Sequence, residues 1–82
     1  MEDKIITWVN SLRLHDPLSP VPPIAGIPPR DFDSALEFIS TSPRLLAKWE
    51  AIPTLIKNRI IHAVAYYFHQ QRKEERDYLA KP

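Results

Sequence analysis

Residues 53–82 read PTLIKNRIIHAVAYYFHQQRKEERDYLAKP, and this stretch decides the fold because its two halves differ in character. From Gln70 to Asp77 there is no large apolar residue. The stretch therefore predicts one long helix whose first half packs in a core and whose polar extension, residues 70–82, projects into water toward a partner or a further segment. In the first half, apolar side chains recur every three or four positions and so share one helix face: Leu55, Ile56, Ile60, Ala63, Val64, Tyr67 and Phe68.

A second amphipathic stretch, Glu2 to Leu14, opens the chain and predicts a first helix. Acidic side chains stand in its first turn, where the helix dipole favours negative charge. Its apolar stripe consists of Ile5, Ile6, Trp8, Val9, Leu12 and Leu14.

Residues 15–29 cannot form a helix, because six of the nine prolines lie in this window, and each removes a backbone donor and favours an extended predecessor. Four aliphatic residues recur there every three positions, the repeat of polyproline II. We interpret the window as an ordered strap that lays one apolar edge across the helices. A flexible linker and an exposed polyproline ligand remain alternatives. The possible strap contacts are Leu18, Val21, Ile24 and Ile27.

Two shorter helices are expected between the strap and the long helix. Asp31 or Asp33 can cap a helix that runs through Ser40, with Phe32, Ala35, Leu36 and Ile39 on one face. Ser42 can cap a third helix, Pro43 to Ala51, with Leu45, Leu46 and Trp49 facing inward. The predicted fold is all-α: a single domain, residues 1–82, with a small bundle of about four helices and a proline-rich crossover between helices 1 and 2.

Composition narrows the function classes. The chain has 82 residues, 44% hydrophobic and 26% charged, which is typical of one small globular domain. It has no cysteine, and neither a signal peptide nor the ~18–20 consecutive apolar residues of a membrane span is present. We therefore expect an intracellular protein, most simply a cytoplasmic one, without membrane contact.

No catalytic or metal-binding motif is found. His62 and His69 are seven residues apart on the long helix, so their side chains lie about 10 Å apart along its axis, too far for one ion. Ser40 and Ser42 are better explained as helix caps than as nucleophiles, and Asp31 and Asp33 are likewise read as a pair of caps. We predict a non-enzymatic protein without cofactor or metal.

Binding to another protein, or self-association, fits the remaining features. Tyr66 and Tyr67 point about 100° apart on a helix, so they cannot both face one core. The mechanism that we expect is burial of aromatic and aliphatic side chains of the last helix, with its charges setting orientation. The candidate partner-binding residues are Tyr66, His69, Arg72, Lys73, Arg76, Tyr78 and Leu79.

A small nucleic-acid-associated protein is the alternative. Residues 51–82 carry six bases and three acids, and the basic face of the last helix would contact phosphates. Its cations are Lys57, Arg59, Arg72, Lys73 and Arg76. The interleaved acids oppose about half of this charge, and the net charge of the whole chain is only +1, so protein binding is favoured.

One short segment resembles a known family. The run Trp8-Val9-Asn10-Ser11-Leu12, followed by Asp16-Pro17 and Val21, is similar to the opening helix of Hook-type calponin-homology domains. The resemblance covers about fourteen residues, and the prolines that follow depart from the family pattern. It implies an all-α adaptor that binds a helix of another protein through an apolar groove, with Trp8 and Leu12 in the core.

Overall fold

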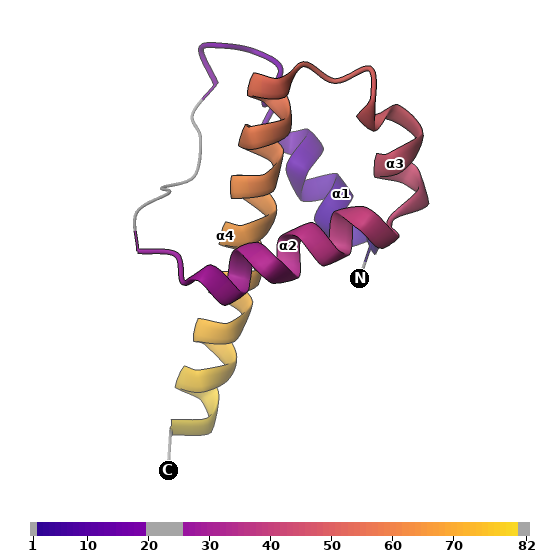
Figure 1. Ribbon diagram of the computed structural model, residues 1–82. Helices are drawn as coiled ribbons and strands as arrows, with labels where there is room; N and C mark the ends of the chain where they lie inside the picture. The colour runs from indigo at the N-terminus through magenta and orange to yellow at the C-terminus, as the bar shows by residue number, and fades with distance from the viewer. Residues whose placement is uncertain (1, 20–25, 81–82) are drawn as a thin grey trace.

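The computed structural model describes the backbone of residues 2–19 and 26–80, and the side chains of these residues up to position 76. It confirms the all-α prediction, because these ranges contain four helices and no strand. Figure 1 shows their arrangement. The helices are α1 (Glu2–Ser11), α2 (Pro29–Thr41), α3 (Pro43–Trp49) and α4 (Thr54–Ala80).

The long helix α4 is the centre of the molecule. In Figure 1, α2 crosses in front of the middle of α4, α1 lies beside the upper half of α4 with its start behind α2, and α3 rises at the side, beyond the end of α2. The closest packing is between α2 and α4, and the core is built from the apolar faces of α1, α2 and α4. The buried apolar residues are Ile5, Ile6, Val9, Leu14, Ala35, Ile39, Ile60, Ala63, Val64 and Ala65.

The end of α1 differs from the expectation. The helix stops at Ser11, three residues before the predicted end, and Arg13 adopts a left-handed conformation with φ of 50°. This turn brings Leu14 back into the core, where it is buried. Leu14 therefore belongs to the core as predicted, but it lies in a turn and not in the helix.

A single side chain of α4 holds the segment that follows this turn. The guanidinium of Arg59 donates hydrogen bonds to the backbone carbonyl oxygens of Leu14, Asp16 (3.1 Å) and Ser19 (2.9 Å). Three carbonyl groups that no helix ladder satisfies thus share one partly buried cation, which ties the start of the proline-rich crossover to α4.

The strap prediction is only partly testable. Leu18 is 91% exposed, so it does not contact the helices as expected. The Asp16 carboxylate turns the chain at this point by accepting a hydrogen bond from the backbone N–H of Leu18 at 2.9 Å. Ile27 does pack against the core, whereas Val21 and Ile24 lie outside the described residues.

A proline stands at or directly before the start of α2, α3 and α4, as predicted for α3 but not for α2. Pro29 and Pro43 occupy the first turns of α2 and α3, and Pro53 directly precedes α4. The predicted cap of α2 was wrong, because the helix begins at Pro29 with Pro28 at the capping position. Ser40 was also misassigned: it lies inside α2, where its hydroxyl donates to the carbonyl of Glu37 at 2.8 Å.

Three leucines that were expected to face inward are exposed: Leu36 (49%), Leu46 (45%) and Leu55 (71%). The buried row of α2 runs through positions 31, 35 and 39, and Leu36 is turned about 100° away from it. The short helix α3 buries none of its residues, and Leu55 lies in the first turn of α4, more than one turn before buried Ile60.

At the junction of α2 and α3, removing a serine hydroxyl is expected not to destabilise the protein. Ser42 takes the capping position of α3, but its hydroxyl makes no capping hydrogen bond; it is 1% exposed and has no partner among the described atoms. An unsatisfied buried hydroxyl is unfavourable, whereas a functioning serine cap is worth about 1 kcal/mol. Ser42→Ala should therefore leave the free energy of unfolding unchanged or raise it by up to about 1 kcal/mol in urea titration. A loss of about 1 kcal/mol would mean that the hydroxyl does cap α3; Ser40→Ala is the matched control.

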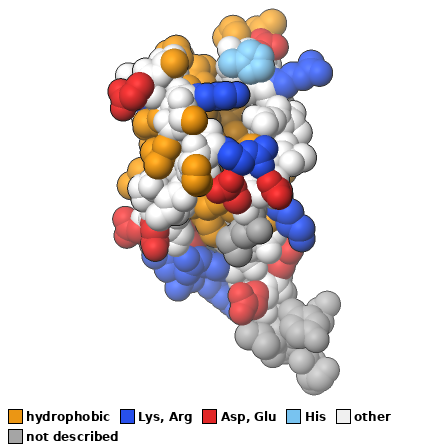
Figure 2. Space-filling model, turned by 90° about the vertical axis from the view of Figure 1, so that its right-hand side faces the viewer, with side chains coloured by type: hydrophobic (Ala, Val, Ile, Leu, Met, Phe, Trp, Pro, Cys, Tyr) orange, Lys and Arg blue, Asp and Glu red, His pale blue; other side chains and the backbone are white. Residues whose placement is uncertain are grey.

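The predicted projection of α4 is observed. The helix has 27 residues and so is about 40 Å long, and its side chains at positions 71 and 73–76 are exposed. Figure 2 shows hydrophobic and charged side chains interspersed over the bundle, with a group of Lys and Arg side chains lower down, near the projecting part of α4. Within the described residues, no helix is both long and apolar enough to cross a bilayer.

Candidate functional site

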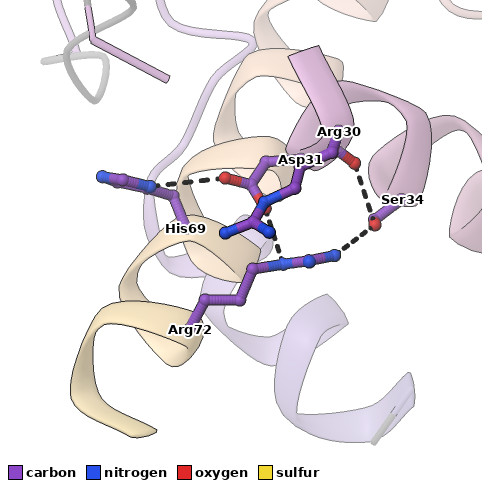
Figure 3. Close-up of polar contacts among 5 residues, drawn as sticks. All are labelled: Arg30, Asp31, Ser34, His69 and Arg72. Atoms are coloured by element: carbon purple, nitrogen blue, oxygen red, sulfur yellow. Dashed lines mark hydrogen bonds and ion pairs between the residues drawn. The ribbon is translucent and has the colours of Figure 1, made fainter. Parts of the chain in front are cut away.

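The first turn of α2 lies against the middle of α4 through a group of polar side chains (Figure 3). Asp31 comes from α2 and is fully buried. Its Oδ1 lies 2.7 Å from Nε of Arg72, and its Oδ2 lies 3.3 Å from Nδ1 of His69. Arg72 also donates to the hydroxyl oxygen of Ser34 at 2.7 Å, and that hydroxyl donates to the carbonyl of Arg30 at 3.0 Å. The four side chains therefore fasten α2 to α4.

The contact between Asp31 and Arg72 is chiefly electrostatic. Asp31 Oδ1 accepts no aligned hydrogen bond among the described groups, although Nε of Arg72 is close to it. The side chain of Arg72 is 38% exposed, so only one member of the pair is removed from water. The carboxylate also sits in the first turn of α2, where it complements the positive end of the helix dipole.

This arrangement corrects the role predicted for Asp31 and places two candidate binding residues in contact with it. The side chain of Asp31 faces the long helix and does not cap α2. His69 and Arg72 were expected to face a partner, but both engage the carboxylate of this chain. They lie at the boundary of the bundle, because Asp31 at the start of α2 meets α4 at these two positions.

Beside this contact is a hollow of about 340 Å³, which we name the basic hollow. It is lined by Pro28, Arg30, His69, Arg72, Lys73 and Arg76, and no carboxylate is part of its lining. A second, more open hollow of about 360 Å³ adjoins it and shares Arg30, Arg72 and Arg76, but Glu75 also lines it. Figure 3 shows the side chain of Arg30 extending over the Asp31–Arg72 pair.

Only some of the cations of the basic hollow have a carboxylate partner among the described side chains. Arg72 is paired with Asp31, but no carboxylate among the described side chains lies within 4.0 Å of Arg30, Lys73 or Arg76. Four cationic side chains around one small volume repel one another. An anion in this hollow would relieve that repulsion, which makes the hollow the strongest candidate site in the described part of the molecule.

The other candidate binding residues lie elsewhere. Tyr66 is half-buried and stacks on Trp8 of α1, with ring centroids 6.4 Å apart and planes 13° apart. The ring of Tyr67 is tilted against the same indole, with centroids 5.6 Å apart and planes at 50°. Both tyrosine rings thus contact one indole, and both remain partly exposed to solvent. The side chains of Tyr78 and Leu79 lie outside the described part of the structure.

Three of the cations on the basic face of α4 make contacts within the chain. Arg59 is occupied by three backbone carbonyls, and Arg72 by Asp31. The ammonium of Lys57 lies 5.6 Å from the ring centroid of Trp49, in a cation–π contact. Lys73 and Arg76 line the hollow and have no such partner among the side chains that the structure describes.

The histidines do not converge. His62 Nδ1 contacts the backbone carbonyl of Asn58 at 2.7 Å, and its ring meets the edge of Phe32. His15 is exposed in the turn after α1, far along the chain from His69 on α4. Within the described residues, no group of three or more His, Cys, Asp and Glu side chains could hold a metal ion.

Arg30 is the cation of the basic hollow that the sequence analysis missed. It lies on α2, whereas the other cations lie on α4, and no spacing pattern in the sequence links it to them. Asp31 did have a signal. Positions 31, 35 and 39 are spaced by four, which places the carboxylate in line with buried Ala35 and Ile39. An acid on an apolar row predicts a buried partner of opposite charge.

In comparisons with protein-family models, with curated proteins and with solved structures, no match to this chain is found. The resemblance of the first helix to Hook-type calponin-homology domains therefore stays a prediction.

Proposed function

We propose that the protein acts by binding, not catalysis, and that it holds an anionic segment of another protein in the basic hollow. The observation that carries the proposal is the convergence of Arg30, Lys73 and Arg76 on one hollow whose lining includes no acid. Two of these cations come from the exposed part of α4 and one from the start of α2, so an extended segment can reach all three.

A protein partner is favoured over nucleic acid by the number of available cations. Nucleic-acid binding that is independent of sequence depends on many phosphate contacts, commonly 6–10. Here only three cations lack an ion-pair partner among the described side chains, and the two of them on α4, Lys73 and Arg76, flank the acids Glu74 and Glu75 in the sequence. A long polyanion would have to pass these acids, whereas a short anionic segment of a protein would not.

A titration of the ¹⁵N-labelled protein with a ten-residue glutamate peptide tests the proposal. Backbone amide signals of Arg30, Lys73 and Arg76 should shift, and the effect should weaken as salt is added. The double variant Arg30→Gln/Arg76→Gln should bind the peptide at least about tenfold more weakly, because it loses two charged hydrogen-bond donors. Arg72 is left unchanged because it also supports the fold.

The matched control is Lys4→Gln/Lys48→Gln, which removes the same charge from exposed positions on α1 and α3. It should bind the peptide as the parent does. Equal weakening in both double variants would mean that the peptide responds to overall charge only, and the proposal would fail. Tighter binding of a mixed-sequence DNA duplex than of the peptide would also overturn it, in favour of the nucleic-acid alternative.

A further inference from the structure

Resting on the proposed function, we infer that the anionic group held in the basic hollow is a phosphorylated side chain of the partner, not a run of carboxylates. The hollow presents positive charge within a small volume of about 340 Å³. A phosphoryl group concentrates a charge of about −1.5 to −2 and three acceptor oxygens at one point. Three cations without a described carboxylate neighbour match that charge and those oxygens.

The lining of the neighbouring hollow favours a ligand with one concentrated charge over a ligand with a run of carboxylates. Glu75 lines it together with Arg30, Arg72 and Arg76. A run of acidic residues that filled the basic hollow and continued into its neighbour would bring like charges together there. A single dianion flanked by neutral residues avoids that repulsion and still uses the arginines at the boundary of the two hollows.

The donors themselves also suit a phosphoryl group. Arg30 and Arg76 carry planar guanidinium groups, which can give two parallel hydrogen bonds to phosphate oxygens. They come from different helices, so their donors approach the hollow from two sides. Lys73 adds a point charge. The start of α2 adds little, because Pro29 has no N–H and the N–H of Asp31 already bonds to the carbonyl of Pro28 at 3.0 Å.

Two five-residue peptides test the inference: alanine peptides with blocked ends that carry either phosphoserine or glutamate at the centre. Chemical shifts of the ¹⁵N-labelled protein give the affinity and the place of binding, and the ³¹P signal of the phosphopeptide gives an independent readout. We expect the phosphopeptide to bind at least about tenfold more tightly than its glutamate counterpart, because phosphoserine brings a charge of about −1.5 to −2 and three acceptor oxygens, whereas glutamate brings one charge and two oxygens. Its shifts should centre on Arg30, Lys73 and Arg76.

A conservative variant separates geometry from charge. Arg76→Lys keeps the charge but loses the paired donors, which fit phosphate and carboxylate oxygens alike, so both peptides should bind more weakly, and the phosphoserine peptide by the larger factor because it offers more acceptor oxygens. Lys48→Arg, a change of the same two side-chain types on α3, is the control and should alter neither affinity.

The outcomes separate this inference from the proposed function. Equal affinities for the two peptides would overturn the phosphoryl preference and leave acidic-segment binding in place. Shifts outside the hollow, or tighter binding of a single-stranded oligonucleotide at equal phosphate concentration, would overturn the inference. If neither short peptide binds and the ten-residue glutamate peptide is also silent, both proposals fail.

Discussion

Arg72→Met should lower the free energy of unfolding by about 3 kcal/mol, at the lower end of the range for breaking a buried ion pair. The reason is the partner left behind: Asp31 is fully buried and would lose the cation 2.7 Å from its Oδ1. Water and His69 can compensate only in part, because the carboxylate has no exposed surface. Urea denaturation followed by circular dichroism measures the loss.

The converse substitution should cost less. In Asp31→Asn the guanidinium of Arg72, which is 38% exposed, can turn to water, so we expect a loss of about 1 kcal/mol. The double variant Asp31→Asn/Arg72→Met should recover much of the stability that Arg72→Met alone loses. If the double variant lost the sum of the two single losses in free energy of unfolding, or if both single losses were small, the ion pair would not hold α2 against α4.

Arg59→Gln should lower the free energy of unfolding by about 3 kcal/mol, because a charged donor gives about 1.5–3 kcal/mol per hydrogen bond and the three bonds are not additive. The backbone carbonyls of Leu14, Asp16 and Ser19 would all lose their guanidinium partner. Besides the shift in urea, hydrogen exchange of the turn amides of Asp16 and Ser19 should accelerate more than exchange in α2.

Arg44→Gln is the matched control for Arg59→Gln. Its guanidinium pairs with Asp3 at the surface, where the two side chains are 54% and 92% exposed, so the loss should be at most about 1 kcal/mol. If the two arginine variants were equally stable, the Arg59 contacts would have no structural weight and the crossover would be held by its apolar contacts, such as that of Ile27.

Local periodicity was sufficient to predict the helices. The apolar spacings and the prolines at positions 43 and 53 predicted the number of helices and the starts of α1, α3 and α4 to within one residue, whereas the start of α2 and the ends of α1 and α3 were misplaced. The errors occurred where one helix meets another. Nothing in the sequence around Leu55 or Leu46 indicates that no neighbouring helix covers that side, because exposure there depends on which faces α2 and α3 present to α4.

The candidate site was predicted less well than the fold, for the same reason. Lys73 and Arg76 were identified as binding candidates and do line the basic hollow. Arg30 was missed because it joins them only once α2 has crossed α4, and Asp31 was read as a local cap although its partner is 41 positions further along the chain. The spacing of residues within one helix does not reveal which distant residues they will contact. The exception is Asp31, whose place in the apolar row of α2 indicates a buried partner.

The segment of α4 beyond Arg72 has eight residues, too few to nucleate a helix alone in water. It can be helical because the bundle has already formed the costly first turns, and each further residue only propagates them. This segment should therefore melt together with the bundle, without a transition of its own. A ligand that contacts Lys73 and Arg76 would meet a helix turn that is already ordered, so association would not carry the entropy loss of folding that segment.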